Sequence, residues 1–238
     1  MKVVFDHVSK SFGVINALND IDFSVNSGEF LFIVGPSGAG KSTVLKLVLN
    51  QIKPSSGNIM IDDHNIFKLK KPQIDKIRRQ IGVIFQDYQL IPDKTVEENI
   101  TLALNINNCP SALIFEKTDN VLNRVNLGNR RHLFPSQLSG GELQRTSLAR
   151  ALVIDPKIIL ADEPTGNLDV ENSWNLIKLL KDINENLGTT IIMTTHNVDI
   201  IKSLNKRIIS LFNGEIVSDT DILTKMKNNS KKHHIHSH

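Results

Sequence analysis

The feature that most constrains the fold is a glycine-rich segment between two apolar stretches. It reads Gly35-Pro36-Ser37-Gly38-Ala39-Gly40-Lys41-Ser42, which matches the pattern glycine, four residues, glycine, lysine, serine. Residues 30–34 before it are all apolar, as in a buried strand. Residues 41–52 after it place apolar side chains on one face of a helix. This strand, loop and helix predict an α/β fold in which the loop holds a phosphate group.

The residue types in this loop suit phosphate chemistry. Glycines let consecutive backbone N–H groups converge on an anion, and the start of the next helix adds positive partial charge. We expect Lys41 to reach the β- and γ-phosphates of a nucleotide and the Ser42 hydroxyl to ligate Mg²⁺. The alternative is an ordinary glycine-rich turn, which the flanking strand and helix disfavour. The expected nucleotide-binding residues of this loop are Gly35, Pro36, Ser37, Gly38, Ala39, Gly40, Lys41, Ser42 and Thr43.

Short apolar strands alternate with amphipathic helices in the last third of the chain. Strands are expected at residues 158–161, 190–193 and 208–212, and helices at 170–187 and 197–204. This alternation predicts a mostly parallel sheet that binds its ligand at the carboxyl ends of its strands. Strands are also expected at residues 3–8 and 21–25, in an N-terminal antiparallel β region. Residues 87–150 are richer in helical pattern and predict an inserted helical subdomain.

Composition excludes several classes of function. Of the 238 residues 40% are hydrophobic and 22% charged, which excludes a disordered chain. The single cysteine, Cys109, excludes an intrachain disulfide. The net charge of +3 depends on four lysines near the end, in a Lys/His-rich tail that we expect at 223–238 to be disordered, so we expect no nucleic-acid partner. The longest apolar run, residues 30–34, is far too short to span a membrane, so any membrane part must come from a partner.

A second chemical signal is the pair of acids Asp162 and Glu163, which follows a strand of buried type. Asp162 at the strand end can hold the Mg²⁺ shell, and Glu163 can polarise an attacking water as a general base. The alternative is an acidic turn that caps the next helix. The phosphate loop upstream favours the catalytic interpretation.

A third signal is the octet Leu138-Ser139-Gly140-Gly141-Glu142-Leu143-Gln144-Arg145. Its serine and glutamate have the spacing of a capping box, which is a sufficient structural explanation of those two residues. The two glycines also bare the start of the helix, so that its amide groups can meet an anion. One nucleotide does not need two such helix ends. We therefore expect a dimer in which this end meets the nucleotide on the other subunit.

With the phosphate loop and the Leu160-Ala161-Asp162-Glu163-Pro164 segment, this octet resembles the ATP-binding cassette ATPases. The resemblance implies a P-loop NTPase domain over residues 1–222. It implies that Gln86 couples Mg²⁺ and water to the membrane partner and that His196 contacts the γ-phosphate. It also places Asp169 at a dimer interface and Phe12 on the adenine ring. Three of these residues also have a structural alternative: Gln86 as a surface glutamine, His196 as a helix cap and Phe12 as a core aromatic.

The resemblance assigns the following residues to an ATP site with Mg²⁺. The catalytic set is Glu163, His196 and Gln86; the metal set is Ser42, Gln86 and Asp162; the nucleotide set adds Phe12, Ser139, Gly140, Gly141, Glu142 and Asp169 to the phosphate loop.

Within this family, the run Arg78-Arg79-Gln80-Ile81-Gly82 and the following Phe85-Gln86-Asp87 are most similar to the cassettes of bacterial cell division. The similarity implies a peripheral protein at the cytoplasmic face of the inner membrane, with an integral membrane partner docking near residues 86–93. It implies that this partner transmits dimer closure to cell-wall hydrolases. Two alternatives remain: the ATPase of a lipoprotein-releasing or macrolide-export transporter, and a soluble ATPase acting on DNA or ribosomes.

Overall fold

We describe the protein from a computed structural model that covers residues 1–220. Its centre is a six-stranded sheet with the order β10-β9-β3-β8-β7-β6. The strands are β3 (Phe30–Val34), β6 (Ile81–Ile84), β7 (Ile158–Asp162), β8 (Thr190–Thr194), β9 (Arg207–Phe212) and β10 (Glu215–Asp219). All neighbours pair in parallel except β9 and β10. The carboxyl ends of five strands therefore share one edge of the sheet.

A four-stranded antiparallel sheet lies beside the central sheet, with the order β2-β1-β4-β5. It consists of β1 (Val3–Phe12), β2 (Ile15–Val25), β4 (Ser56–Ile61) and β5 (His64–Asn65). Helix α1 (Lys41–Val48) buries its apolar face with residues of both sheets, in one hydrophobic cluster. A short helix, α2 (Lys71–Arg78), leads from this sheet to β6.

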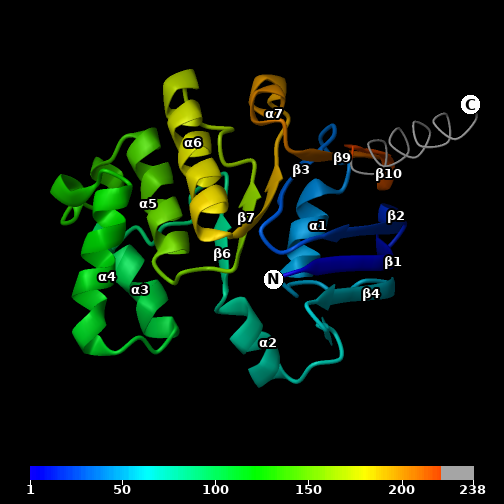
Figure 1. The fold of residues 1–238 in the computed structure, drawn as a ribbon, viewed down its shortest axis with the longest axis horizontal. Coiled ribbons are helices and arrows are strands. Elements are labelled where there is room, and N and C mark those ends of the chain that lie inside the picture. Colours follow the sequence, from blue (N-terminus) through cyan, green and yellow to red (C-terminus); the bar gives the residue numbers. More distant parts are fainter. Residues whose placement is uncertain (221–238) are drawn as a thin grey trace, which may run out of the picture.

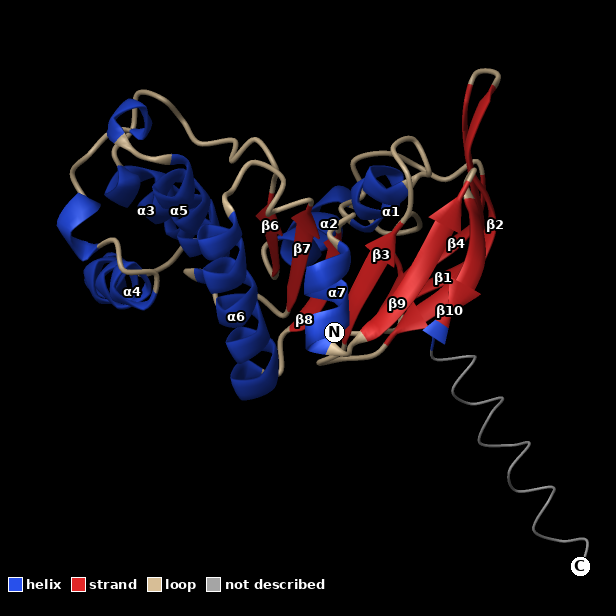
Figure 2. Cartoon of the chain, turned by 90° about the horizontal axis from the view of Figure 1, so that it is seen from above, coloured by secondary structure: helices blue, strands red, loops and turns tan. Residues whose placement is uncertain are grey.

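The helices between β6 and β7 gather at the other end of the molecule (Figures 1 and 2). They are α3 (Val96–Ile106), α4 (Ser111–Arg124), the 3₁₀ turns Gly128–Arg130 and Pro135–Gln137, and α5 (Gly140–Leu152). These helices and α6 (Val170–Leu187) share a second hydrophobic cluster, separate from the one that contains α1. Helix α7 (Val198–Leu204) joins β8 to β9. The predicted fold class is confirmed: a mostly parallel sheet with an antiparallel β region and a helical insertion.

The side chains of the central strands point alternately to the two faces of the sheet, and other elements cover both of these faces. Leu31 and Ile33 of β3 belong to the cluster with α1, whereas Phe30 and Phe32 belong to the cluster with α3, α5 and α6. Successive side chains of a strand point to opposite faces. A strand that is apolar throughout therefore needs cover on both sides.

Some elements differ from the prediction. The sequence patterns do not predict β4, β5, α2 or β10, and they predict that the helix after the phosphate loop reaches residue 52. It ends at Val48 because Asn50 adopts the left-handed conformation, φ 51°, and the amide of Gln51 returns to the Lys46 carbonyl. The basic tail predicted at 223–238 lies outside the described residues. No helix within residues 1–220 has the length and apolarity needed to cross a bilayer.

One buried ion-pair network closes the edge of the central sheet. Arg207 donates two hydrogen bonds to the Asp219 carboxylate, at 2.9 and 2.6 Å, and one to Glu29 at 2.9 Å. Its side chain is 11% exposed and that of Asp219 only 3%. The guanidinium also donates to the Ser24 carbonyl on β2, so the network joins both sheets.

We expect Arg207→Leu to lower the free energy of unfolding by about 3–5 kcal/mol, because the change leaves the Asp219 carboxylate buried without its main partner. Urea denaturation measures this loss. Lys206→Leu is the matched control, because Lys206 pairs with Glu185, whose side chain is 46% exposed. Its loss should be below about 1 kcal/mol. Equal losses in the two variants would contradict the prediction.

Candidate active site

A cavity of about 690 Å³ opens at the carboxyl edge of the parallel strands. That volume suits a ligand of nucleotide size. Twelve residues predicted for the site line it: Gly35, Pro36, Ser37, Gly38, Gly40, Lys41, Ser42, Thr43, Gln86, Asp162, Glu163 and His196. Segments that are 160 residues apart in the chain therefore meet here.

Lys41 begins α1 at the base of the cavity and is 7% exposed. Its ammonium donates to the carbonyls of Gly35 at 2.9 Å and Pro36 at 3.1 Å, and lies 3.4 Å from Glu163 Oε1. The residue before it, Gly40, has φ 102°, and a Cβ there would lie 2.5 Å from the Ala17 carbonyl oxygen. Only glycine fits this position, and it brings the start of α1 to the cavity.

Asp162, the last residue of β7, receives two hydrogen bonds on one oxygen. Ser42 Oγ lies 3.1 Å and Thr194 Oγ1 2.7 Å from Asp162 Oδ1. Thr194 is completely buried at the end of β8. Sequence reasoning missed this threonine, although a hydroxyl at a strand end two residues before His196 was a usable signal.

Glu163 follows Asp162 in the left-handed conformation, with φ 44°. Such backbone strain is costly in a residue with a side chain and is concentrated at functional sites. The Glu163 amide donates to the Thr194 hydroxyl at 2.9 Å, which holds this turn. Glu163 Oε2 lies 2.8 Å from His196 Nδ1, so the carboxylate bridges His196 and Lys41.

Gln86 reaches the cavity from the loop after β6. Its backbone carbonyl accepts a hydrogen bond of 2.9 Å from Asn167 Nδ2, in the loop before α6. The side chain lies against Gly166, where a Cβ would approach Gln86 Nε2 to 3.0 Å. The two loops at this edge of the cavity are thus joined to each other.

Phe12 and Ala39 do not line the cavity. The Phe12 ring is 47% exposed at the tip of the β1–β2 hairpin, with Lys10 Nζ 4.8 Å from its centre. Ala39 belongs to the phosphate loop, but its side chain is buried in the hydrophobic core. The lining instead includes three residues that sequence reasoning missed, Ile15, Asn16 and Ala17 at the start of β2.

The glycine pair of the third motif lies outside this cavity, at the start of α5. Ser139 and Glu142 form the predicted capping box: Ser139 Oγ accepts from the Glu142 amide, and Glu142 Oε2 accepts from the Ser139 amide. Arg130 donates to Glu142 Oε1 at 2.7 Å. The first two residues of α5 after this cap, Gly140 and Gly141, have no side chains to cover the helix start.

Asp169 lies next to this helix end through Asn172, which sequence reasoning missed. Asn172 Nδ2 donates to Asp169 Oδ2 at 2.7 Å, and Arg145 donates to Asn172 Oδ1 at 3.2 Å. A Cβ on Gly141 would lie 2.6 Å from Asn172 Oδ1. The structure thus joins Asp169 and the glycine pair into a second group, which we call the α5 group: Ser139, Gly140, Gly141, Glu142 and Asp169.

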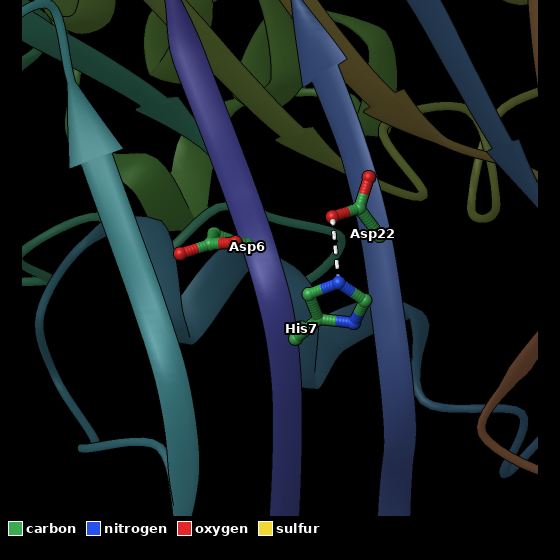
Figure 3. A group of neighbouring side chains, drawn as sticks. All are labelled: Asp6, His7 and Asp22. Atoms are coloured by element: carbon green, nitrogen blue, oxygen red, sulfur yellow. Dashed lines mark ion pairs between the residues drawn. The ribbon is translucent and has the colours of Figure 1, made fainter.

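Figure 3 shows a third cluster, Asp6, His7 and Asp22, on the exposed face of the antiparallel sheet. His7 Nδ1 lies 2.9 Å from Asp20, and the hydrogen bond to that carboxylate raises the pKa of His7. Asp6 points toward β4, where it accepts a hydrogen bond from Asn58. The dashed line in Figure 3 marks the ion pair between His7 Nε2 and Asp22, at 4.0 Å. All three side chains have protein partners on the surface, and we assign them no metal.

The Glu142 contacts predict a measurable dependence of stability on pH. The hydrogen bonds from Arg130 and the Ser139 amide hold the pKa of Glu142 down, from the ordinary 4.5 to about 2. The ionised carboxylate therefore stabilises the fold above pH 4.5, and this contribution is lost as the pH falls toward 2. We expect Glu142→Gln to cost about 1–2 kcal/mol at pH 7 and roughly half of that or less at pH 3, by urea denaturation.

Glu98→Gln is the matched control. Glu98 holds the same position in the capping box of α3, and no arginine within residues 1–220 pairs with it. Its substitution should have a smaller effect. A cost for Glu142→Gln that is the same at pH 7 and pH 3 would contradict the assignment.

Comparison with known proteins agrees with this geometry. Residues 18–166 match the ABC transporter family model. The chain is 45% identical to the cell division ATP-binding protein FtsE of Bacillus subtilis, over 86% of this chain and 90% of the relative. It is 41% identical to FtsE of Escherichia coli, over 89% of this chain and 96% of the relative.

Solved structures give the same result. A dimeric ATP-binding cassette in a post-hydrolysis state, bound to ADP and Pi, superposes with a TM-score of 0.84. It is 36% identical, and the match covers 91% of this chain and 97% of that one. The chain belongs to the ATP-binding cassette family, in the group of the cell division ATP-binding proteins FtsE.

Proposed function

We propose that this chain hydrolyses ATP as one half of a head-to-tail homodimer within a membrane complex of the FtsEX type. The observation that carries the proposal is the separation of two complementary groups. The cavity offers a cation, amide groups and acids for a nucleotide, whereas the α5 group offers a helix start with two glycines that does not line this cavity. Two copies facing each other would supply both groups to each of two ATP molecules.

ATP would bind with its phosphates on the loop before α1. Lys41 is held at the base of the cavity and would exchange its carbonyl partners for the β- and γ-phosphates. The loop amides and the start of α1 favour the same negative charge. Phe12 remains our proposed stacking partner for adenine, near the three β2 residues that line the cavity.

The donor set fits Mg²⁺. Ser42 Oγ and Asp162 Oδ1 lie 3.1 Å apart, and Gln86 faces the same cavity. Hydroxyl, carboxylate and amide oxygens are the ligands that Mg²⁺ takes beside a nucleotide. When bound, Mg²⁺ would neutralise charge on the β- and γ-phosphates. Thr194 fixes the orientation of the Asp162 carboxylate.

Glu163 is the proposed general base. Its carboxylate would accept a proton from the attacking water. His196, 2.8 Å away, holds one carboxylate oxygen in place and would contact the γ-phosphate. The strained turn at Glu163 keeps the carboxylate at the cavity rather than along the strand.

The partner is an integral membrane protein of FtsX type, which docks near residues 86–93 at the cytoplasmic face of the membrane. Tyr88, Leu90 and Ile91 are half-buried in this segment, which begins at Gln86. Docking here would place the partner next to a catalytic residue. The complex would transmit dimer closure across the membrane to cell-wall hydrolases.

Glu163→Gln tests the catalytic assignment. The variant should bind ATP and form a stable dimer, while its turnover falls about a hundredfold or more, because the base is lost and the binding groups remain. Size-exclusion chromatography with ATP and a phosphate-release assay measure both effects. Lys41→Ala is the comparison and should abolish nucleotide binding. Hydrolysis by Glu163→Gln at the parental rate would show that the base lies elsewhere.

Isolation of the chain from detergent-solubilised membranes tests the partner. We expect an FtsX-type membrane protein to co-purify, and to be lost on charge reversal at Asp87 and Asp93, which are exposed in the docking segment. Mass spectrometry identifies the partner. A permease with a large periplasmic domain or a lipoprotein cargo would instead support the transporter alternative.

A further inference from the structure

Arg150, near the end of α5, makes a contact that the proposed reaction does not yet use. Its guanidinium donates to the Gln89 carbonyl at 2.6 Å and to the Tyr88 carbonyl at 3.0 Å. Both acceptors lie in the loop after Gln86. A helix of the insertion thus holds the backbone of a loop that enters the ATP cavity.

The backbone held by Arg150 is strained. Tyr88 has φ 61° and Gln89 φ 47°, two consecutive left-handed residues with side chains. In this region the Cβ of a residue lies too close to the following carbonyl oxygen, so residues with side chains adopt it at a cost. Such a turn persists only where the surrounding structure determines it. The forked guanidinium, with a donor on each carbonyl, is that determinant.

Among the described residues, Arg150 has hydrogen-bond partners but no charged partner. Within residues 1–220 no carboxylate lies within ion-pair distance of its guanidinium. Burial, uncompensated by an acid, lowers the pKa of Arg150. A partly buried cation that donates to two loop carbonyls, with no acid beside it, costs desolvation energy. An ordinary surface arginine would not need that position.

Two further contacts attach the same loop to the helical insertion. Asn99 of α3 is completely buried; it accepts from the Ile91 amide at 2.8 Å and donates to the Ile91 carbonyl. The Tyr88 hydroxyl lies beside Gly140, at 3.4 Å from the position that a Cβ would take. Along α5, Arg150 and Gly140 are ten residues, about 15 Å, apart. Tyr88 therefore contacts α5 twice, through its carbonyl at Arg150 and through its hydroxyl at Gly140.

We propose that Arg150 is a positioning residue for Gln86. The end of β6 fixes Gln86 from one side, and the turn at Tyr88 and Gln89, which Arg150 holds, fixes it from the other. Arg150 does not touch the nucleotide. It determines whether the Gln86 side chain reaches the reacting groups. This inference rests on the catalytic role of Gln86 in the proposed function.

The test is a double-mutant cycle of Arg150→Leu and Gln86→Ala in the full chain. ATP hydrolysis gives kcat and KM for the parent, both single variants and the double variant. Hydrogen–deuterium exchange of peptides that cover residues 86–91 reports the loop without reference to activity. Arg124→Leu, the same change at an exposed residue of the insertion, is the control.

We expect Arg150→Leu to lower kcat about tenfold, since small misplacement of a catalytic group has effects of this order. KM for ATP should stay within about twofold, because the phosphate loop is unchanged. Exchange at residues 86–91 should accelerate about tenfold. In the Gln86→Ala background the Arg150 change should have no further effect on kcat, because it acts through that side chain. Arg124→Leu should match the parent.

Each other result overturns the inference. An unchanged kcat in Arg150→Leu, or the same tenfold loss in both backgrounds, would show that Arg150 does not act through Gln86. If Gln86→Ala kept the parental kcat, the catalytic role of Gln86 would fail as well, which separates the two failures. Where Arg150→Leu does not fold, Arg150→Lys decides. It keeps the charge and one donor direction, and should lower kcat about threefold at constant KM only while Gln86 is present.

Discussion

The parallel pairing of β7 with β8 is the constraint on which the site depends. It sets Asp162 opposite Thr194, and the pairing of β3 with β8 sets Ile33 opposite the same threonine. The buried Thr194 hydroxyl then donates to Asp162 and accepts from the Glu163 amide. A slip of one residue would turn every side chain of β7 to the other face. The acids would leave the cavity, Ser42 would lose its hydrogen bond to Asp162, and Lys41 would keep its two loop carbonyls but lose Glu163.

The same contacts explain how the chain tolerates this charge without a nucleotide. Lys41 is nearly buried, and a lone buried ammonium is costly. Two loop carbonyls and the Glu163 carboxylate satisfy it, while His196 shares the other oxygen of that carboxylate. A nucleotide phosphate competes for the same donors. Binding would therefore weaken the 3.4 Å contact between Lys41 Nζ and Glu163 Oε1.

Sequence reasoning succeeded where one short pattern determines both a local structure and its neighbours. The phosphate loop between an apolar strand and a helix and the Ser139 capping box are such patterns, and the structure contains both of them. It failed for β4, whose first residues are Ser56, Gly57 and Asn58, poor strand formers that are ordered by pairing with β1. Helix α2 is short and buries none of its residues fully; only two isoleucines, Ile74 and Ile77, mark its inner side, which is too weak a pattern to predict a helix. The contacts of Thr194 with Asp162, of Arg145 with Asn172 and of Arg150 with the Gln89 carbonyl join segments far apart in the chain. A local pattern does not predict which distant group such a side chain meets.

Contacts between distant segments connect the loop after Gln86 to the α5 group. Asn167 holds the Gln86 carbonyl, and the Tyr88 hydroxyl lies beside Gly140. On the other side of that helix end, Asn172 fills the space that Gly141 leaves and binds Asp169. A displacement of the loop after Gln86 would reach the α5 group as well, because Tyr88 lies in that loop and its hydroxyl lies beside Gly140. At Gly141 the absence of a side chain has a reason within the chain itself: a Cβ there would lie 2.6 Å from Asn172 Oδ1. This glycine therefore admits the side chain that ties Asp169 to the start of α5.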